Sequence, residues 1–81
     1  MNGFHVIIRA IPKEQGGGFE AEILELPGVF IFGATLDEVK ENVRRRINSW
    51  MGLMRRLGWV VNIDFTVRAQ GNVSYYSEQL A

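Results

Sequence analysis

The chain of 81 residues carries nine basic and nine acidic side chains, so its formal net charge is zero. This length suffices for one domain, and a neutral chain lacks the positive field that supports non-specific nucleic-acid binding. The sequence contains no cysteine, which excludes disulfides and thiolate metal sites. Because a domain of this size buries a modest share of its surface, we expect subunits to associate as a homodimer or a higher homo-oligomer.

The start of the sequence predicts a strand followed by a loop. Residues 4–12 are rich in β-branched side chains and end at Pro12, which is typical of a strand. The segment has no basic stretch and its apolar run is broken by Arg9, so it does not read as a signal peptide. We therefore expect a cytoplasmic protein with no membrane partner. Three glycines at 16–18 then predict a loop between two strands.

Two further strands are predicted over residues 18–26 and 29–34. In the first of them, apolar side chains alternate with Glu20 and Glu22, so its outer face is acidic. A Pro-Gly pair at 27–28 suits the central positions of a type II turn, whose second central residue needs a positive φ. Short connections of this kind predict an antiparallel meander of three strands.

A long helix is predicted over residues 35–57. Thr35 and Glu38 match a capping box, in which the threonine oxygen accepts a backbone N–H bond from the first turn. Gly58 follows at a position where helices commonly end. Apolar residues recur at steps of three and four, as expected for a helix with one buried stripe: Leu36, Val39, Val43, Ile47, Trp50, Met54 and Leu57.

The last predicted strand covers residues 60–68 and returns after a helical crossover, which favours a parallel partner strand. The predicted fold class is α+β in the order β-β-β-α-β, with the helix on one face of the sheet and the other face uncovered. Residues 69–81 show no clear period. They are either a flexible tail or a segment that packs through Tyr75 and Tyr76, so the expected division is a domain at 1–68 and a tail at 69–81.

Two features of the predicted helix admit two interpretations each. Its arginines form either a solvated face or a partner-binding face: Arg44, Arg45, Arg46, Arg55 and Arg56. The second half of the helix is apolar over a wider arc than one sheet face requires, which indicates either a thick core seam or an oligomer contact: Trp50, Met51, Leu53 and Met54.

The side chains that catalysis would need do not come together in this sequence. Ribonuclease H-like nucleases start with the same order of strands and helix. They bind Mg²⁺ through acidic residues on the first strand, the helix and the fourth strand. Asp64 suits the last of these positions, but residues 4–12 contain no aspartate or glutamate. The single histidine, His5, reads as a surface residue of the sheet. We expect no enzyme activity, no metal site and no cofactor.

Three motifs carry a resemblance to a known family. They are a Gly-Gly-aromatic strand start at 17–19, a Leu-Pro-Gly turn at 26–28, and a Gly-x-Thr-Leu-x-Glu sequence at 33–38 that leads into the helix. With these motifs the chain resembles the HicB family of antitoxins over residues 4–68. The resemblance implies a truncated ribonuclease H-like fold without nuclease residues. It also implies a prokaryotic toxin–antitoxin system, in which the protein binds a HicA-type mRNA interferase toxin and occludes its active site.

Two features depart from that family. Many members carry a C-terminal ribbon-helix-helix or helix-turn-helix module, whereas only thirteen residues follow residue 68 here. We therefore expect a short form without direct DNA binding. A cysteine that is common after the Leu-Pro-Gly turn is also absent, since Val29 follows Gly28, and this difference should affect only packing.

The resemblance also suggests which residues meet the partner. A toxin that binds RNA should present a positive active face, and an inhibitor should offer complementary negative charge. The candidate partner-binding residues are Glu20, Glu22 and Glu25. The alternative is an orphan HicB-like oligomeric interaction or regulatory module with no cognate toxin and no catalysis, with the oligomer contact at Trp50, Met51, Leu53 and Met54.

Overall fold

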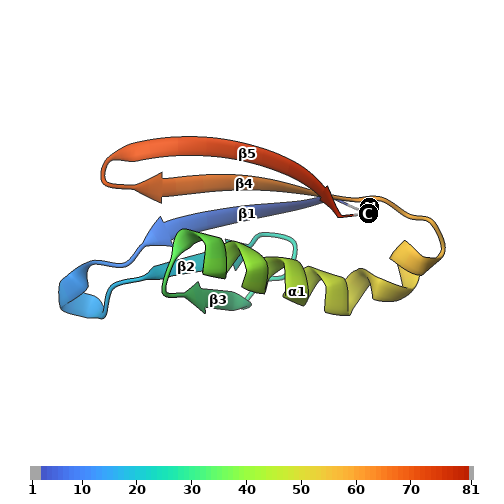
Figure 1. The fold of residues 1–81 in the computed structure, drawn as a ribbon, viewed down its shortest axis with the longest axis horizontal. Coiled ribbons are helices and arrows are strands. Elements are labelled where there is room, and N and C mark those ends of the chain that lie inside the picture. Colours follow the sequence, from blue (N-terminus) through green and yellow to red (C-terminus); the bar gives the residue numbers. More distant parts are fainter. Residues whose placement is uncertain (1–2, 81) are drawn as a thin grey trace.

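The strand, turn and helix signals of the sequence produce a five-stranded sheet with one long helix on one of its faces (Figure 1). The structure is a computed structural model that describes residues 3–80. Its elements are β1 (Gly3–Ala10), a short 3-10 helix (Lys13–Gln15), β2 (Phe19–Ile23), β3 (Phe30–Gly33), α1 (Leu36–Arg56), β4 (Val61–Ala69) and β5 (Asn72–Leu80).

The strands lie in the order β3-β2-β1-β4-β5. The first three strands form the predicted antiparallel meander, and β4 returns beside β1 in parallel after the helix, as expected for a helical crossover. The α+β class and these four strands are confirmed. The predicted order β-β-β-α-β is wrong at its end, because a fifth strand follows.

The fifth strand is formed by residues of the predicted tail at 69–81. β5 pairs antiparallel with β4 along its whole length, from Ala69 opposite Asn72 to Val61 opposite Leu80. The two residues between the strands, Gln70 and Gly71, have φ values of 53° and 77°. Positive φ at both central residues is the signature of a type I′ turn, whose twist matches that of a β-hairpin. The last described residues are therefore part of the sheet, and Ala81 lies outside the described residues.

The core lies between α1 and the sheet face that it covers. In β2 and β4 the buried residues alternate with more exposed ones as predicted, and Phe65 is the largest of the fully buried side chains. Burying apolar side chains of this size stabilises a fold by roughly 1.5–3 kcal/mol each. The buried set is Phe4, Val6, Ile8, Ala21, Ile23, Val39, Val43, Ile47, Val61, Ile63, Phe65 and Val67.

Both ends of α1 are capped by the residues that the sequence indicated. The hydroxyl of Thr35 accepts a hydrogen bond from the backbone N–H of Glu38 at 3.1 Å. At the other end, the N–H of Gly58 donates to Arg55 and the N–H of Trp59 donates to Met54. This pair of bonds is a Schellman motif, which satisfies carbonyls that a helix end otherwise leaves unpaired.

Contacts from α1 hold the two outer strands of the sheet. At β3, a Cβ on Gly33 would lie 2.7 Å from the Cα of Val39, so the helix start approaches that strand too closely for any side chain. At β5, the guanidinium of Arg44 donates to both carboxylate oxygens of Glu78, at 2.9 and 3.0 Å. This forked geometry is the strongest form of a charge-assisted bond, and it fastens β5 to the helix.

The helix is longer than the part of the sheet that it covers. Its last buried residue is Ile47, and the chain beyond it projects past the strand ends to give a molecule 44 Å long and about half as wide (Figure 1). The predicted buried stripe is therefore wrong beyond Ile47, since Trp50 and Leu57 are 62% and 67% exposed. The periodicity is helical throughout, but the sheet ends before the stripe does.

Candidate binding surfaces

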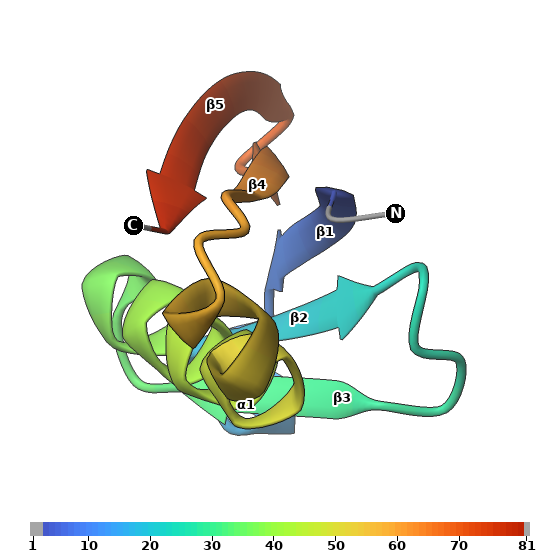
Figure 2. The same ribbon diagram turned by 90° about the vertical axis from the view of Figure 1, so that its right-hand side faces the viewer.

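Seen nearly end-on, α1 lies against one side of a strongly twisted sheet (Figure 2). The strand register identifies the residues on the other side, which we call the open face. Ile7 and Arg9 of β1 stand beside Glu22 and Glu20 of β2. These residues alternate with the buried ones, so their side chains point away from the helix. The open face is the first candidate surface.

Glu20 and Glu22 lie together on the open face, next to two aromatic side chains. The register places Phe32 opposite Glu20 and Phe30 opposite Glu22. The two phenylalanines are 58% and 55% exposed, which is unusual for residues that are normally buried. On the other side of the glutamates, Arg9 approaches Glu22 at 3.7 Å. The four residues Glu20, Glu22, Phe30 and Phe32 are called the acidic–aromatic patch below.

Sequence reasoning missed the two phenylalanines as surface residues. The segment from Val29 to Ala34 is apolar at every position, so alternation alone does not tell which side faces the helix. The signal that identifies them is Gly33, which belongs on the side where the helix approaches closely. The residues on either side of a strand position point to the opposite face, so Phe32 must face away from the helix.

Glu25, the third predicted partner-binding residue, lies apart from the other two. It sits between β2 and β3, where its carboxylate accepts hydrogen bonds from the backbone N–H of His5 and from the Nδ1 of the same residue, both at 2.6 Å. Glu25 thus joins the start of β1 to the turn after β2. The structure does not bring it into one acidic surface with Glu20 and Glu22.

The contact with Glu25 changes the ionisation of both partners. The hydrogen bond and the negative charge of Glu25 raise the pKa of His5 above its usual 6.5, although partial burial acts in the other direction. Burial alone would raise the pKa of Glu25, but the hydrogen bonds from His5 outweigh it and lower that pKa below its usual 4.5. The pair therefore favours a protonated imidazole against an ionised carboxylate.

Nucleophilic chemistry does not follow from this arrangement. The Nε2 atom of His5 faces Asp64 at 3.7 Å, while the hydroxyl of Ser77 donates to Asp64 at 2.6 Å. A serine nucleophile is activated when its hydroxyl bonds directly to the base, and here that hydroxyl bonds to a carboxylate. The contacts form a polar chain that links neighbouring segments of the sheet through Glu25, His5, Asp64 and Ser77.

The second candidate surface is the projecting end of α1. Of the four predicted oligomer-contact residues, Met51 is half-buried against the core, whereas Trp50, Leu53 and Met54 are 62%, 61% and 39% exposed. The loop after the helix adds Trp59, which is 49% exposed. Large exposed apolar clusters mark binding sites on soluble proteins. We call these residues the apolar helix end: Trp50, Leu53, Met54, Leu57, Trp59 and Val60.

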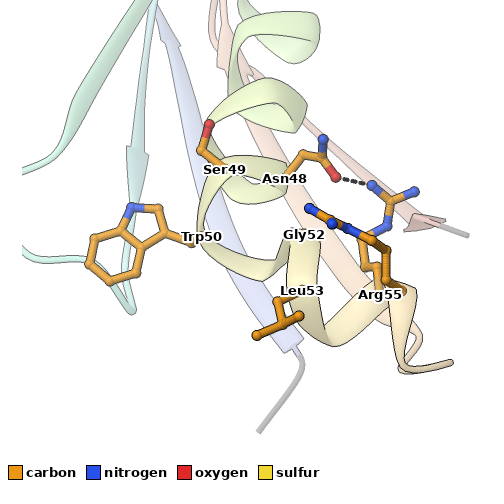
Figure 3. Close-up of a pocket in the computed structure, with 7 residues that line it drawn as sticks. Asn48, Ser49, Trp50, Gly52, Leu53 and Arg55 are labelled. Atoms are coloured by element: carbon orange, nitrogen blue, oxygen red, sulfur yellow. Dashed lines mark hydrogen bonds between the residues drawn. The ribbon is translucent and has the colours of Figure 1, made fainter.

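A hollow of about 620 Å³ lies on this end of the helix, over Gly52. Figure 3 shows Trp50 and Arg55 on opposite sides of α1, with the carbonyl of Asn48 accepting a hydrogen bond from Arg55. Residues 42–63 contain five arginines and no aspartate or glutamate. The apolar helix end therefore lies in a basic part of the molecule, well separated in chain order from Glu20 and Glu22.

Within residues 3–80, no group of three or more histidine and carboxylate side chains is placed to hold a metal ion. Over the same described range, no helix is long and apolar enough to cross a membrane.

No protein-family model, curated protein or solved structure matches this chain.

Proposed function

We propose that this chain is an antitoxin-like protein-binding domain, which neutralises a HicA-type mRNA interferase toxin by occluding its active site. The observation that carries the proposal is the acidic–aromatic patch, where Glu20 and Glu22 stand beside Phe30 and Phe32 on the open face. In this proposal the fold is a truncated ribonuclease H-like fold, and the chain has no catalysis, no cofactor and no direct DNA binding of its own.

The chemistry of the patch suits a basic partner. Negative charge on Glu20 and Glu22 accelerates encounter with a positive surface and disfavours acidic partners. The neighbouring phenylalanines supply apolar area that a partner can bury, and aromatic side chains are enriched in interfaces. Arg9 forms an ion pair with Glu22 at 3.7 Å from the β1 side, and an accessible pair of this kind contributes little that a basic partner would have to overcome.

A toxin that cleaves RNA has to bind a polyanion. Its active site would therefore match the patch in charge. A domain bound there would exclude RNA from the active site by occupying the same positive surface. Binding alone accounts for the inhibition, so the antitoxin needs no chemistry.

The alternative function is that of an orphan oligomeric interaction or regulatory module without a cognate toxin. The apolar helix end favours this alternative, because Trp50, Leu53 and Met54 offer exposed apolar contact area on the projecting end of α1. Obligate homo-oligomer interfaces are apolar in the same way.

The two functions are separated by one experiment. The tagged chain is purified from its own cells, and a co-purifying protein is identified by mass spectrometry, purified alone and tested for RNA cleavage. The proposal expects a small basic protein that cleaves RNA, and expects cleavage to stop on addition of an equimolar amount of the chain. Recovery of the chain only with copies of itself would favour the oligomeric module instead.

A further inference from the structure

The two edges of the sheet differ in how they are protected. β3 is four residues long, and the side-chain amide of Asn42 donates to the backbone carbonyl of Phe32 at 2.8 Å. The bond comes from α1, which also approaches β3 at Gly33. A short strand with an occupied carbonyl offers little for another strand to pair with. The β3 edge is therefore capped.

The other edge, β5, is nine residues long and pairs only with β4 among the described strands (Figure 1). Proteins commonly protect such an edge with lysine, with proline or with a β-bulge. Residues 72–80 contain no lysine, arginine or proline. The register with β4 runs without interruption, so no bulge turns the strand away. Among the described residues, the backbone groups that point outward from β5 pair with no other strand.

The side chains of β5 add little repulsion between two copies of the strand. Its single charged residue, Glu78, is engaged by Arg44 on the helix side. On the open face, Val73 and Tyr75 are 49% and 77% exposed. Aromatic and β-branched residues stabilise neighbouring strands when they stand opposite one another, so these side chains suit a strand of the same composition.

We propose that β5 pairs antiparallel with β5 of a second copy of this chain, so that the two five-stranded sheets join into one. A two-fold axis through the middle of β5 makes the contact the same for both copies. Such a contact uses up the open edge of each copy. The edges that remain are the two capped β3 strands, so the assembly closes as a dimer and does not extend into a fibre.

This inference goes beyond the proposed function and does not depend on it. The dimer leaves the acidic–aromatic patch on β2 and β3 accessible, because those strands lie at the far side of the sheet order from β5. A toxin-bound form of the protein would then contain two copies of the chain with one patch on each. The proposed β5 contact also places self-association on a different surface from the apolar helix end.

Cysteine cross-linking tests the proposal directly, because the chain has no cysteine of its own. Full-length variants Ser74→Cys, Tyr75→Cys, Tyr76→Cys and Ser77→Cys are oxidised one at a time at micromolar concentration and separated without reductant. The proposal expects a disulfide-linked dimer with a single maximum along β5, since only residues near a two-fold axis face their own copies. Leu53→Cys, on the apolar helix end, should stay monomeric under the same conditions.

Two further variants distinguish a specific dimer from cross-links that form by random collision. Tyr75→Lys places two like charges near the proposed axis and should weaken dimerisation on the order of tenfold in sedimentation equilibrium. Phe30→Lys, at an exposed aromatic position on the capped edge, should leave the dimer unchanged. A wild-type chain that sediments as a monomer, or a dimer that forms through Leu53→Cys and ignores Tyr75→Lys, would overturn the proposal.

Discussion

His5 bonds to Glu25 through its backbone N–H and its imidazole, one to each carboxylate oxygen. The two residues are twenty positions apart in the chain, and their contact ties the start of β1 to the turn that follows β2. The same imidazole faces Asp64 on β4 at 3.7 Å. One exposed histidine thus connects the start of β1 to β4 and to the turn that follows β2.

The imidazole of His5 should titrate above its usual pKa of 6.5, because Glu25 stabilises the protonated form. The chain has one histidine, so its imidazole signals in an NMR titration belong to His5 without ambiguity. Glu25→Gln should move the midpoint down toward 6.5. A midpoint that is the same in both proteins would show that the contact does not form in solution.

Stability should depend on pH through the same pair. A raised pKa in the folded state adds stability that is complete below about pH 6.5 and is lost as the pH rises through the folded value. The lowered pKa of Glu25 has the opposite sense, adding stability above its usual 4.5 that is lost as the pH falls. The free energy of unfolding of the wild type, measured with urea, should therefore fall toward both low and high pH. His5→Gln should flatten the alkaline side of this pH profile. An unchanged alkaline slope in that variant would contradict the linkage.

Gly33 should not tolerate a side chain. Its Cβ would meet the backbone of Val39 at the start of α1, so Gly33→Ala should lower the free energy of unfolding by about 1–3 kcal/mol, as overpacking does. Gly52 is the matched control, because a Cβ there meets nothing within 4 Å. Gly52→Ala should raise stability by about 1 kcal/mol, the difference in helix propensity. Equal effects at the two glycines would argue against the close approach of helix and strand.

The forked bond between Arg44 and Glu78 should hold β5 on the sheet. Glu78→Gln keeps the shape but removes the charge, and should cost about 1 kcal/mol of stability, since both side chains are 31% exposed. Hydrogen exchange should rise mainly in β5. Arg45→Gln is the control, because Arg45 meets Glu41 at 3.6 Å from a side chain that is 74% exposed, where ion pairs contribute little. A uniform rise in exchange across the sheet would mean that β5 has no special dependence on this bond.

The parts of the fold that follow from local patterns were predictable. Thr35 and Glu38 mark the start of the helix, the Pro-Gly pair marks the turn before β3, and alternation in β2 and β4 identifies the buried faces. Each of these signals depends on residues that are close in the chain. The parallel direction of β4 also follows from the helical crossover, whereas the choice of β1 as its partner is seen only in the structure.

Two features were not predictable from local pattern. β5 was not predicted, because Gln70-Gly71 is not one of the usual hairpin pairs. In addition, Tyr75 and Tyr76 are adjacent, which obscures any alternation. The exposure of the helix end was not predicted either. A periodic stripe shows which side of a helix is apolar, but it does not show how far the sheet beneath the helix extends. Trp50 continues the stripe of Val43 and Ile47, but the strands that bury those two residues end before reaching it.

The position of Glu25, predicted as a partner-binding residue, also could not be derived from local sequence pattern. Sequence proximity grouped it with Glu20 and Glu22, whereas the chain turns after Ile23 and brings Glu25 to His5. Phe30 and Phe32 belong with the two glutamates instead, since strand pairing places them side by side. Long-range pairing therefore decides the composition of the patch.

The proposed contact between the acidic–aromatic patch and a basic toxin is tested by association kinetics with the protein that co-purifies with the chain. Glu20→Lys combined with Glu22→Lys should slow association strongly at low salt and less at high salt, because screening weakens the field of the wild type. Reversal of Arg45 and Arg56 to glutamate is the matched control of equal size and should leave the rate nearly unchanged. Arginine reversals that abolish binding, together with glutamate reversals that leave the rate unaltered, would contradict the proposed contact and place the partner on the helix.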